Sequence, residues 1–395
     1  MIGIYLSLDP SLQSKRATNS NRAREGTAFL NSCYSHLIFT YSAAAAMRLT
    51  VLLLVVALCE FALCQRQDPF FWLSALRSRG YVHGALQADT TGGDCPIQCD
   101  CPPSFPIAMY CDSRNIQQVP YIPSRMKYLY LQHNEISSIP DGAFDNATGL
   151  VWVMMHQNKL SSDKVSKKVF GKLKNLDRLY LQYNNLTRVP ANLPKSLREL
   201  RLNHNKISKV PANCFEGMTN LSILLLNDNA VQDVGGALKG LNSLTLLDVS
   251  SNKLKKVPDN LPGMLHQLYL ESNSIDALPA DFLSKFVKLQ YVRIGHNQLT
   301  NRGIPPNTFN VSGLVELDLS YNKLERIPPV STSLEHLYLQ ANQIKEFSLG
   351  SICSVVDIMN FSHLKVLRLD GNEITRDDIP NDASLCLRLA SYIEL

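Results

Sequence analysis

Apolar side chains return in one fixed pattern along this chain: leucine-x-x-leucine-x-leucine-x-x-asparagine-x-leucine, with other aliphatic residues replacing leucine in places. The pattern occurs eleven times, and its copies begin at Met126, Leu150, Leu176, Leu197, Leu221, Leu244, Leu265, Leu289, Leu314, Leu334 and Leu364. Side chains alternate between the two faces of a strand. Each leucine-x-leucine segment therefore predicts a short strand with buried leucines and a middle residue that faces solvent.

An asparagine follows each predicted strand where the chain must turn: Asn134, Asn158, Asn184, Asn205, Asn229, Asn252, Asn273, Asn297, Asn322, Asn342 and Asn372. A buried carboxamide there can form hydrogen bonds with backbone groups of adjacent turns. The resulting ladder of asparagines would satisfy donors and acceptors that would otherwise have no partner. One unit cannot bury its apolar side alone, but stacked units share one core. The pattern predicts a leucine-rich repeat horseshoe, an α/β solenoid with a concave parallel β-sheet.

The spacing of these ladder asparagines predicts the convex side. It runs 24, 26 and 21 residues, then 24, 23 and 21, then 24, 25 and 20, and finally 30. The short units carry proline-rich stretches at 189–194, 257–262 and 327–329, which favour extended backbone. Most long units carry a phenylalanine that we expect to fill the outer core: Phe144, Phe170, Phe215, Phe282 and Phe309. We expect an irregular convex side of turns, 3₁₀ and polyproline-type segments, with little α-helix.

The segment before the repeats predicts secretion. Residues 47–64 contain Arg48, an apolar run over 49–59 and a small-residue cleavage site, which is typical of a signal peptide. A membrane anchor is the competing interpretation, but the run is far shorter than the roughly 20 residues that span a bilayer, and Glu60 interrupts it. We interpret residues 1–46 as an upstream or non-native extension and residues 65–94 as the amino-terminal extension of the mature chain.

Six cysteines mark the ends of the repeat region: Cys95, Cys99, Cys101, Cys111, Cys353 and Cys386. The first four lie in an expected amino-terminal cap over 95–124, and the last two lie in the carboxy-terminal part of the repeat region 125–395. Four clustered cysteines could hold zinc. Secretion and the need to cover the exposed core of a terminal repeat favour disulfide caps at both ends, although four cysteines allow three pairings. Cys214 is expected to be a free, inert core thiol.

Composition and charge narrow the function. The net charge of +5 and the charged fraction of 18% are ordinary, and no basic run suggests a nucleic-acid partner. No second apolar stretch is long enough to span a membrane. No nucleophile–base pair, metal triad or phosphate loop is visible, so we expect no enzyme activity and no cofactor. Four histidines share a solvent-facing position before a ladder asparagine, where surface residues are more usual than a metal site: His133, His156, His204 and His296.

The middle residues of the predicted strands form a stripe on the concave surface: Tyr130, Met154, Tyr180, Arg201, Leu225, Asp248, Tyr269, Arg293, Asp318, Tyr338 and Arg368. Tyrosine and arginine are enriched at binding hot spots, although tyrosine also suits any exposed strand face. We favour a recognition surface over the neutral interpretation, because four tyrosines and three arginines share one curved sheet.

The cap spacing C-x3-C-x-C-x9-C, the long-long-short rhythm and the stretched last repeat resemble the small leucine-rich repeat proteoglycans, in particular their keratan-sulfate class. The resemblance covers residues 95–395 and implies the pairs Cys95–Cys101, Cys99–Cys111 and Cys353–Cys386. It also implies N-linked keratan sulfate, and five sequons match the family's glycan sites: Asn146, Asn185, Asn220, Asn310 and Asn360. The sulfated tyrosines of some members have one counterpart in the extension, Tyr81, which lacks acidic neighbours.

The resemblance implies a secreted protein of the extracellular matrix that binds fibrillar collagen, type I first, and regulates fibril assembly and diameter. Growth factors of the TGF-beta type are further expected partners. The family's collagen contacts match Glu373 and Arg376 here, with Thr375 where a lysine is expected, and Arg368 and Tyr338 are further candidates. The alternative is a soluble leucine-rich repeat decoy or recognition protein for a growth factor or microbial ligand.

Overall fold

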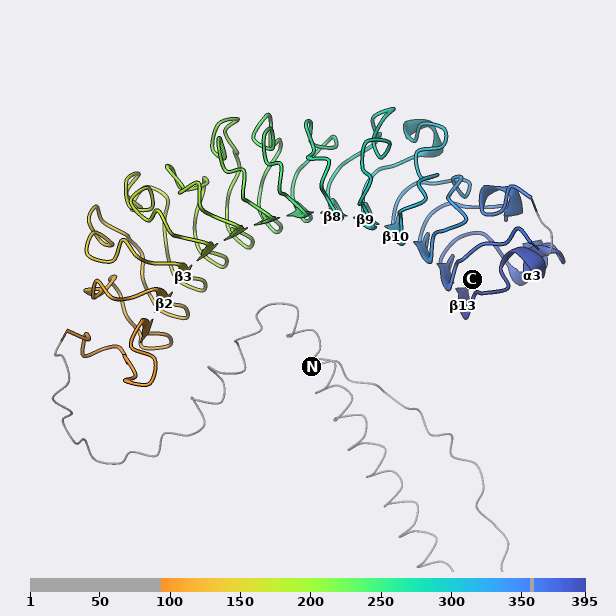
Figure 1. Cartoon of the computed structure of the whole chain (residues 1–395). Helices are drawn as coiled ribbons and strands as arrows, with labels where there is room; N and C mark the ends of the chain where they lie inside the picture. The colour runs from red at the N-terminus through yellow and green to blue at the C-terminus, as the bar shows by residue number, and fades with distance from the viewer. Residues whose placement is uncertain (1–93, 356–358) are drawn as a thin grey trace, which may run out of the picture. The chain divides into compact units, whose positions relative to one another are not determined.

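The repeat region folds into a curved stack of coils, and each coil contributes one three-residue strand to a single parallel sheet (Figure 1). The strands are β1 (Ala108–Tyr110), β2 (Tyr128–Tyr130), β3 (Trp152–Met154), β4 (Arg178–Tyr180), β5 (Glu199–Arg201), β6 (Ile223–Leu225), β7 (Leu246–Asp248), β8 (Gln267–Tyr269), β9 (Tyr291–Arg293), β10 (Glu316–Asp318), β11 (His336–Tyr338), β12 (Val366–Arg368) and β13 (Tyr392–Glu394). Their order in the sheet is their order in the chain. The predicted solenoid is therefore confirmed.

The computed structural model describes residues 94–355 and 359–395. The predicted upstream extension, signal peptide and amino-terminal extension, with Tyr81, lie outside the described residues. These predictions stay predictions.

The strands pair in register, because every coil places its leucine-x-leucine segment at the same height. Leu129 pairs with Val153, and Val153 pairs with Leu179. The central residue of every strand from β1 to β12 is at most 1% exposed, whereas Ile393 of the terminal strand β13 is 41% exposed. The leucines thus form one core that continues through the whole stack, as expected for a repeat that cannot bury its apolar face alone.

The convex side consists mainly of turns and extended segments. Three 3₁₀-helices lie there or at its edge: η1 (Asn301–Gly303), η2 (Leu349–Ser351) and η3 (Arg376–Asp378). Within the described ranges the one α-helix is α3 (Ala383–Cys386). The five outer phenylalanines are at most 3% exposed, and the rings of Phe144 and Phe170 lie 6.0 Å apart. The expected irregular convex side is confirmed.

Disulfides close both ends of the stack. The structure pairs Cys95 with Cys101 and Cys99 with Cys111 ahead of β2, and it pairs Cys353 with Cys386 around the last repeat. These are the pairs that the family resemblance implies. Cys214 is the free cysteine of the described chain. Burial raises the pKa of its thiol to about 12, which keeps it protonated and unreactive.

Candidate functional site

The ladder asparagines hold neighbouring coils together and thereby fix the concave face. The Oδ1 atom of Asn158 accepts the backbone N–H of Ile136 at 2.9 Å, from the preceding coil. Its Nδ2 atom donates to the carbonyl of Leu131 in that coil at 2.8 Å and to the carbonyl of Met155 in its own coil at 3.2 Å. The same arrangement recurs from coil to coil, so each carboxamide satisfies buried backbone groups of two coils.

The residue immediately before each ladder asparagine has a left-handed backbone. Its φ lies between +49° and +56° in ten coils and at +71° in the eleventh, at His133, Gln157, Tyr183, His204, Asp228, Ser251, Ser272, His296, Tyr321, Ala341 and Gly371. Glycine, which tolerates this region best, occupies the position once. This strained turn ends each strand and brings the asparagine under the sheet. The residue types at this position gave no signal for it.

Two members of the predicted concave stripe are buried. Met154 is 3% exposed and Tyr180 is 2% exposed, so neither contributes an accessible surface. The guanidinium of Arg201 lies 4.3 Å from the centre of the Tyr180 ring and covers it. The prediction that every middle residue faces solvent is therefore wrong at these two positions. The other nine are half-buried.

A second polar row lies beside the ladder, at the position two residues before each ladder asparagine. We call it the neighbouring row. Six of its side chains have a buried polar atom without a hydrogen-bond partner: Gln132, His156, Gln182, Asn203, Glu271 and Gln340. His156 belongs to this row, so the prediction that it shares a position with His133, His204 and His296 is wrong. The sequence already contains the difference, because His156 stands two residues before its ladder asparagine and the other three histidines stand one residue before theirs.

Burial and charge set the ionisation of this row. Burial, with the nearby imidazole of His133 and the guanidinium of Arg201, lowers the pKa of His156 to about 4. Burial raises the pKa of Glu271 to about 7, and the carboxylates of Asp248 and Asp318 add to the shift. Both side chains are therefore largely neutral between these values.

The amino-terminal part of the concave face is aromatic and cationic. The rings of Tyr110 and Tyr130 stack at 4.6 Å. The guanidinium of Arg178 lies 4.4 Å from the centre of the Trp152 ring, which is within cation–π range. The carboxylate of Glu199 lies 2.6 Å from Nη2 of Arg201. This part of the face presents flat rings beside guanidinium groups, whose charges are partly balanced by Glu199.

The centre of the concave face is acidic. Asp248 accepts hydrogen bonds from the hydroxyl and the backbone N–H of Ser250 at 2.7 and 3.0 Å, and burial raises the pKa of its carboxyl. The guanidinium Nε of Arg293 donates to Glu316 at 2.7 Å. Two further carboxylates, Glu271 and Asp318, share this region without an equally close cation among the described ion pairs.

The structure separates the four collagen-binding candidates into two groups. Tyr338 and Arg368 are paired residues of β11 and β12 on the concave face. Arg368 is held between Asp370 and Glu394, both at 2.9 Å. Glu373 and Arg376 lie beyond the last ladder asparagine, on the carboxy-terminal edge, and both are exposed.

A lysine from the neighbouring coil stands beside Glu373. The Nζ atom of Lys345 lies 3.5 Å from Oε2 of Glu373. Sequence reasoning expected a lysine at Thr375 and missed Lys345, which is 28 residues away in the chain but adjacent across the coils. The carboxy-terminal edge therefore has an acid–base pair of the kind that the family resemblance implies.

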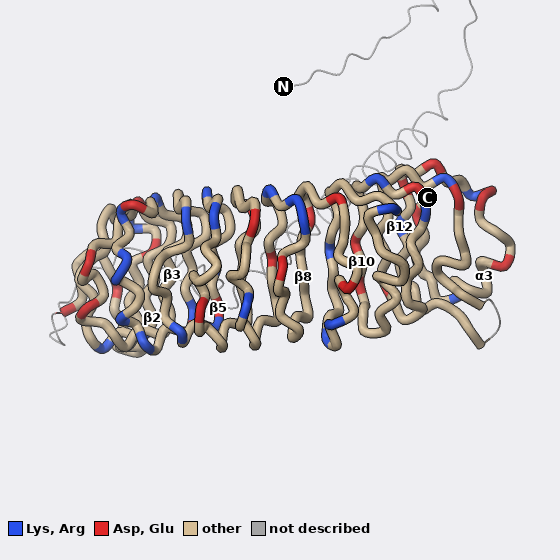
Figure 2. Tube along the Cα trace, turned by 90° about the horizontal axis from the view of Figure 1, so that it is seen from above, with Lys and Arg blue, Asp and Glu red and all other residues tan. Residues whose placement is uncertain are grey.

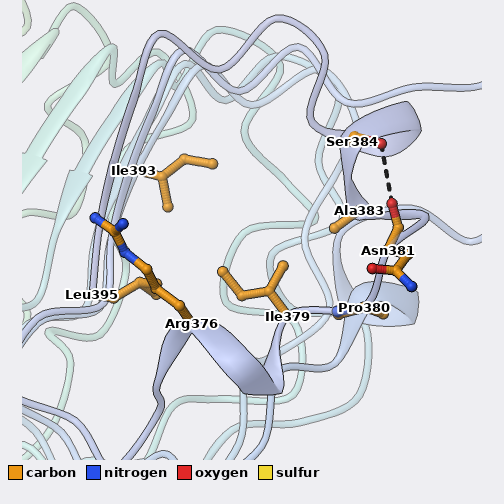
Figure 3. Close-up of a pocket in the computed structure, with 8 residues that line it drawn as sticks. All are labelled: Arg376, Ile379, Pro380, Asn381, Ala383, Ser384, Ile393 and Leu395. Carbon is orange, nitrogen blue, oxygen red and sulfur yellow. Dashed lines mark hydrogen bonds between the residues drawn. The ribbon is translucent and has the colours of Figure 1, made fainter.

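Arg376 begins η3 and borders an open pocket at the carboxy-terminal end (Figure 3). Figure 3 shows Arg376 beside Leu395, across the pocket from Asn381 and Ser384. A capping box between Thr375 and Asp378 fixes the turn that carries it. The Arg376 side chain thus projects from a well-defined short helix.

The five sequon asparagines are all exposed: Asn146, Asn185, Asn220, Asn310 and Asn360. No helix in the described ranges is long and apolar enough to cross a membrane. The same ranges contain no cluster of three or more histidine, cysteine, aspartate or glutamate side chains that could hold a metal ion.

The comparisons with known proteins agree with this architecture. Family models described as leucine rich repeat match residues 124–186, 195–254 and 313–332. Among solved structures, the complex of Latrophilin 3, Unc5D and FLRT2 (LRR) contains a chain similar to this one at 25% identity, with a TM-score of 0.56, covering 73% of this chain and 91% of that chain. The class of protein is thus a leucine-rich repeat solenoid.

Within this class, the full-length relatives are matrix proteoglycans. Fibromodulin from Bos taurus is 54% identical over 376 residues, covering 88% of this chain and all of the relative, and fibromodulin from Homo sapiens is 53% identical with the same coverage. Lumican from Coturnix japonica is 48% identical, covering 76% of this chain and 88% of the relative. The chain belongs to the small leucine-rich repeat proteoglycan family, as an extracellular matrix protein more similar to fibromodulin than to lumican.

Proposed function

We propose that the protein is secreted, binds fibrillar collagen and regulates the assembly and diameter of collagen fibrils. The observation that carries the proposal is the similarity to fibromodulin along the full length of that relative. Type I collagen is the first partner to test. Growth factors of the TGF-beta type are a further proposed class of partner, and we propose that the protein has no enzymatic activity.

The carboxy-terminal edge is the proposed collagen contact. Glu373, its neighbour Lys345 and Arg376 present one acidic and two basic groups on an exposed, well-supported turn. A collagen triple helix is a thin rod with exposed charges, so charge complementarity should set its register on this edge. The adjacent concave residues Tyr338 and Arg368 can extend the contact. A rigid curved body bound to a fibril would block lateral addition of further collagen molecules.

Fibril formation by type I collagen, followed by turbidity, tests the proposal. The purified secreted protein should delay the rise in turbidity and give thinner fibrils. The double variant Glu373→Lys/Arg376→Glu should bind collagen roughly tenfold more weakly, because exposed charge pairs contribute modestly and are screened over about 8–10 Å. Its matched control is Glu325→Lys/Arg326→Glu, which reverses the same two charges on an exposed edge two coils earlier.

Each outcome has a consequence. If the double variant and its control bind collagen equally well, the carboxy-terminal edge is not the collagen contact. If the unchanged protein ignores collagen at micromolar concentration, the function as a soluble recognition protein for a growth factor or microbial ligand takes its place.

Glycosylation is part of the proposal. Exposed sequons allow access for the transferase, and we propose that all five asparagines carry N-linked glycans of the keratan-sulfate type. Enzymatic removal of N-glycans should sharpen and shift the band of the secreted protein. Joint substitution of Asn146, Asn185, Asn220, Asn310 and Asn360 by glutamine should remove the whole shift, and a remaining shift would contradict the assignment.

A further inference from the structure

Positive charge is concentrated in one part of the solenoid. The segment 159–209 has 13 Lys and Arg residues against 3 Asp and Glu residues, a net charge of +10 in a chain whose total is +5. Figure 2 shows mostly Lys and Arg around β3 and β5, whereas the carboxy-terminal coils mix both signs. The basic residues are spaced along the sequence, so no polybasic run reveals them.

The coil geometry brings four of these residues, together with Lys253 and Lys255 from a later coil, to one flank, where the chain leaves the concave sheet. Arg188 and Lys209 pair as a parallel bridge between adjacent coils. The Arg188 guanidinium donates to the carbonyl of Ser162 in the preceding coil at 3.2 Å, two residues before Lys164. Lys206 and Lys253 both stand directly after a ladder asparagine, at equivalent positions two coils apart. We call the exposed residues of this surface the basic flank: Lys164, Arg188, Lys206, Lys209, Lys253 and Lys255.

Neighbouring carboxylates balance the cations of the basic flank only in part. The hydrogen bond from Ser161, and then the charges of Lys164 and Arg188, lower the pKa of the Asp163 carboxyl. None of the six forms an ion pair with another described residue, whereas Lys159 and Lys256 at its border are paired with Glu135 and Asp259. Two carboxylates lie close to the flank in sequence. Asp163 accepts a hydrogen bond from Ser161, and Asp233 accepts the backbone N–H of Gly235. The flank therefore presents more positive than negative charge.

We propose that the basic flank binds a linear sulfated glycosaminoglycan. Neighbouring coils of a parallel sheet lie about 4.8 Å apart, so the cations of the β3, β4 and β5 coils follow one another closely. The β6 coil has Ala230 and Asp233 at the equivalent positions, and the cations resume in the β7 coil. A small anion could contact one or two of them, whereas an extended polyanion can contact all. Proteins that bind single-stranded nucleic acid usually add several aromatic stacking platforms. The positions that form this flank carry no aromatic residue in these coils, and one stacked pair, Tyr183 and His204, lies beside them. Sulfate groups on a flexible sugar chain match this arrangement.

The proposal is separate from collagen binding, because its residues lie in the coils of β3 to β7 and not at the carboxy-terminal edge. Asn185 stands directly after its ladder asparagine, at the position that Lys159 and Lys206 occupy in the adjacent coils. A glycan on Asn185 would cover part of the flank. The test therefore uses the full secreted chain, both unchanged and with Asn185→Gln, and the flank variants are made in both backgrounds.

Binding to immobilised heparin, measured by surface plasmon resonance at several salt concentrations, tests the proposal. Lys206→Ala/Lys209→Ala should weaken binding roughly fivefold to tenfold and should lower the slope of log affinity against log salt by about two, one for each lost contact. The matched control is Lys323→Ala/Arg326→Ala, which removes two exposed cations at the equivalent positions of a later coil, where Glu325 stands between them. It should change the affinity less than twofold.

Two further probes test the ligand class. Hyaluronan, which has carboxylates and no sulfate, should bind much more weakly than heparin. A single-stranded oligonucleotide of matched charge should also bind more weakly. Equal loss in the flank variant and its control would overturn the location. Absence of heparin binding at physiological salt, or tighter binding of the oligonucleotide, would overturn the ligand.

Discussion

Two polar rows run along the solenoid two residues apart, and they differ in how their buried groups are satisfied. In the ladder row, the carboxamide of Asn184 accepts the N–H of Leu160 at 2.9 Å and donates to the carbonyl of Met155 at 3.0 Å. In the neighbouring row of the same coil, Oε1 of Gln182 is buried without a partner. Both side chains are at most 9% exposed. The two side chains are thus equally buried, but only the asparagine has its polar atoms satisfied by hydrogen bonds.

The difference separates scaffold from surface. The ladder bonds to backbone, which is the same in every coil, so its residue never changes along the stack. The neighbouring row lies at the edge of the concave face, where it is free to vary from glutamine to histidine, glutamate or glycine. A buried polar atom without a partner is destabilising. The neighbouring row is therefore retained at a cost in stability.

Removing a ladder side chain should have the largest effect. Asn184→Ala leaves the N–H of Leu160 and the carbonyl of Met155 buried without this partner. The expected loss is about 3–5 kcal/mol of the free energy of unfolding, since each unsatisfied buried group costs about 1–3 kcal/mol. Urea denaturation followed by circular dichroism measures it. A loss below 1 kcal/mol would show that the two rows do not differ.

Glu271 should give the next largest effect, with a sign set by pH. Its folded pKa is raised to about 7, so the folded state binds an extra proton at intermediate pH, and stability falls as pH rises from the ordinary glutamate value to about 7. Glu271→Gln should therefore stabilise the protein by about 2–3 kcal/mol at pH 8 and by almost nothing at pH 4. Melting temperatures across this range check it. The matched control is Glu325→Gln, which removes an exposed carboxylate.

His156 should show the opposite pH response. The pKa of His156 in the folded protein is lowered to about 4. The unfolded state therefore binds more protons below the ordinary histidine pKa, and the protein becomes less stable as the pH is lowered from about 6.5 to about 4. His156→Gln should remove about 2 kcal/mol of this loss at pH 5 and change little at pH 8. Thermal unfolding at both pH values tests the expectation. A parallel pH profile in the two proteins would contradict a buried, neutral imidazole.

An apolar substitution in the neighbouring row should have the smallest effect. Gln182→Met keeps the size of the side chain and removes the unpaired oxygen, so the free energy of unfolding should change by less than about 0.5 kcal/mol. Compared with Asn184→Ala in the same urea experiment, this variant measures the contrast within one coil. A cost near that of Asn184→Ala would mean that Gln182 has a partner after all.

The sequence by itself determined the architecture, because its signal is local and periodic. Each leucine-x-leucine segment makes a strand, and each following asparagine closes the turn in the same way, so eleven copies predict the sheet, its order and the ladder. The outer phenylalanines, such as Phe144 and Phe170, were predicted for the same reason, since their position repeats. Because the sequence repeats, each coil makes the same core contacts as the coil before it.

Only the tertiary structure decided which side chains meet across coils. Tyr180 is buried because Arg201 of the next coil covers its ring, and Glu373 gains Lys345 from the coil before it. The basic flank likewise joins residues such as Arg188 and Lys209, which come from different repeats. These contacts depend on pairs of non-repeating residues about twenty or more positions apart. Their identity varies from coil to coil, so the periodic pattern carries the fold and the exceptions to it carry the surface.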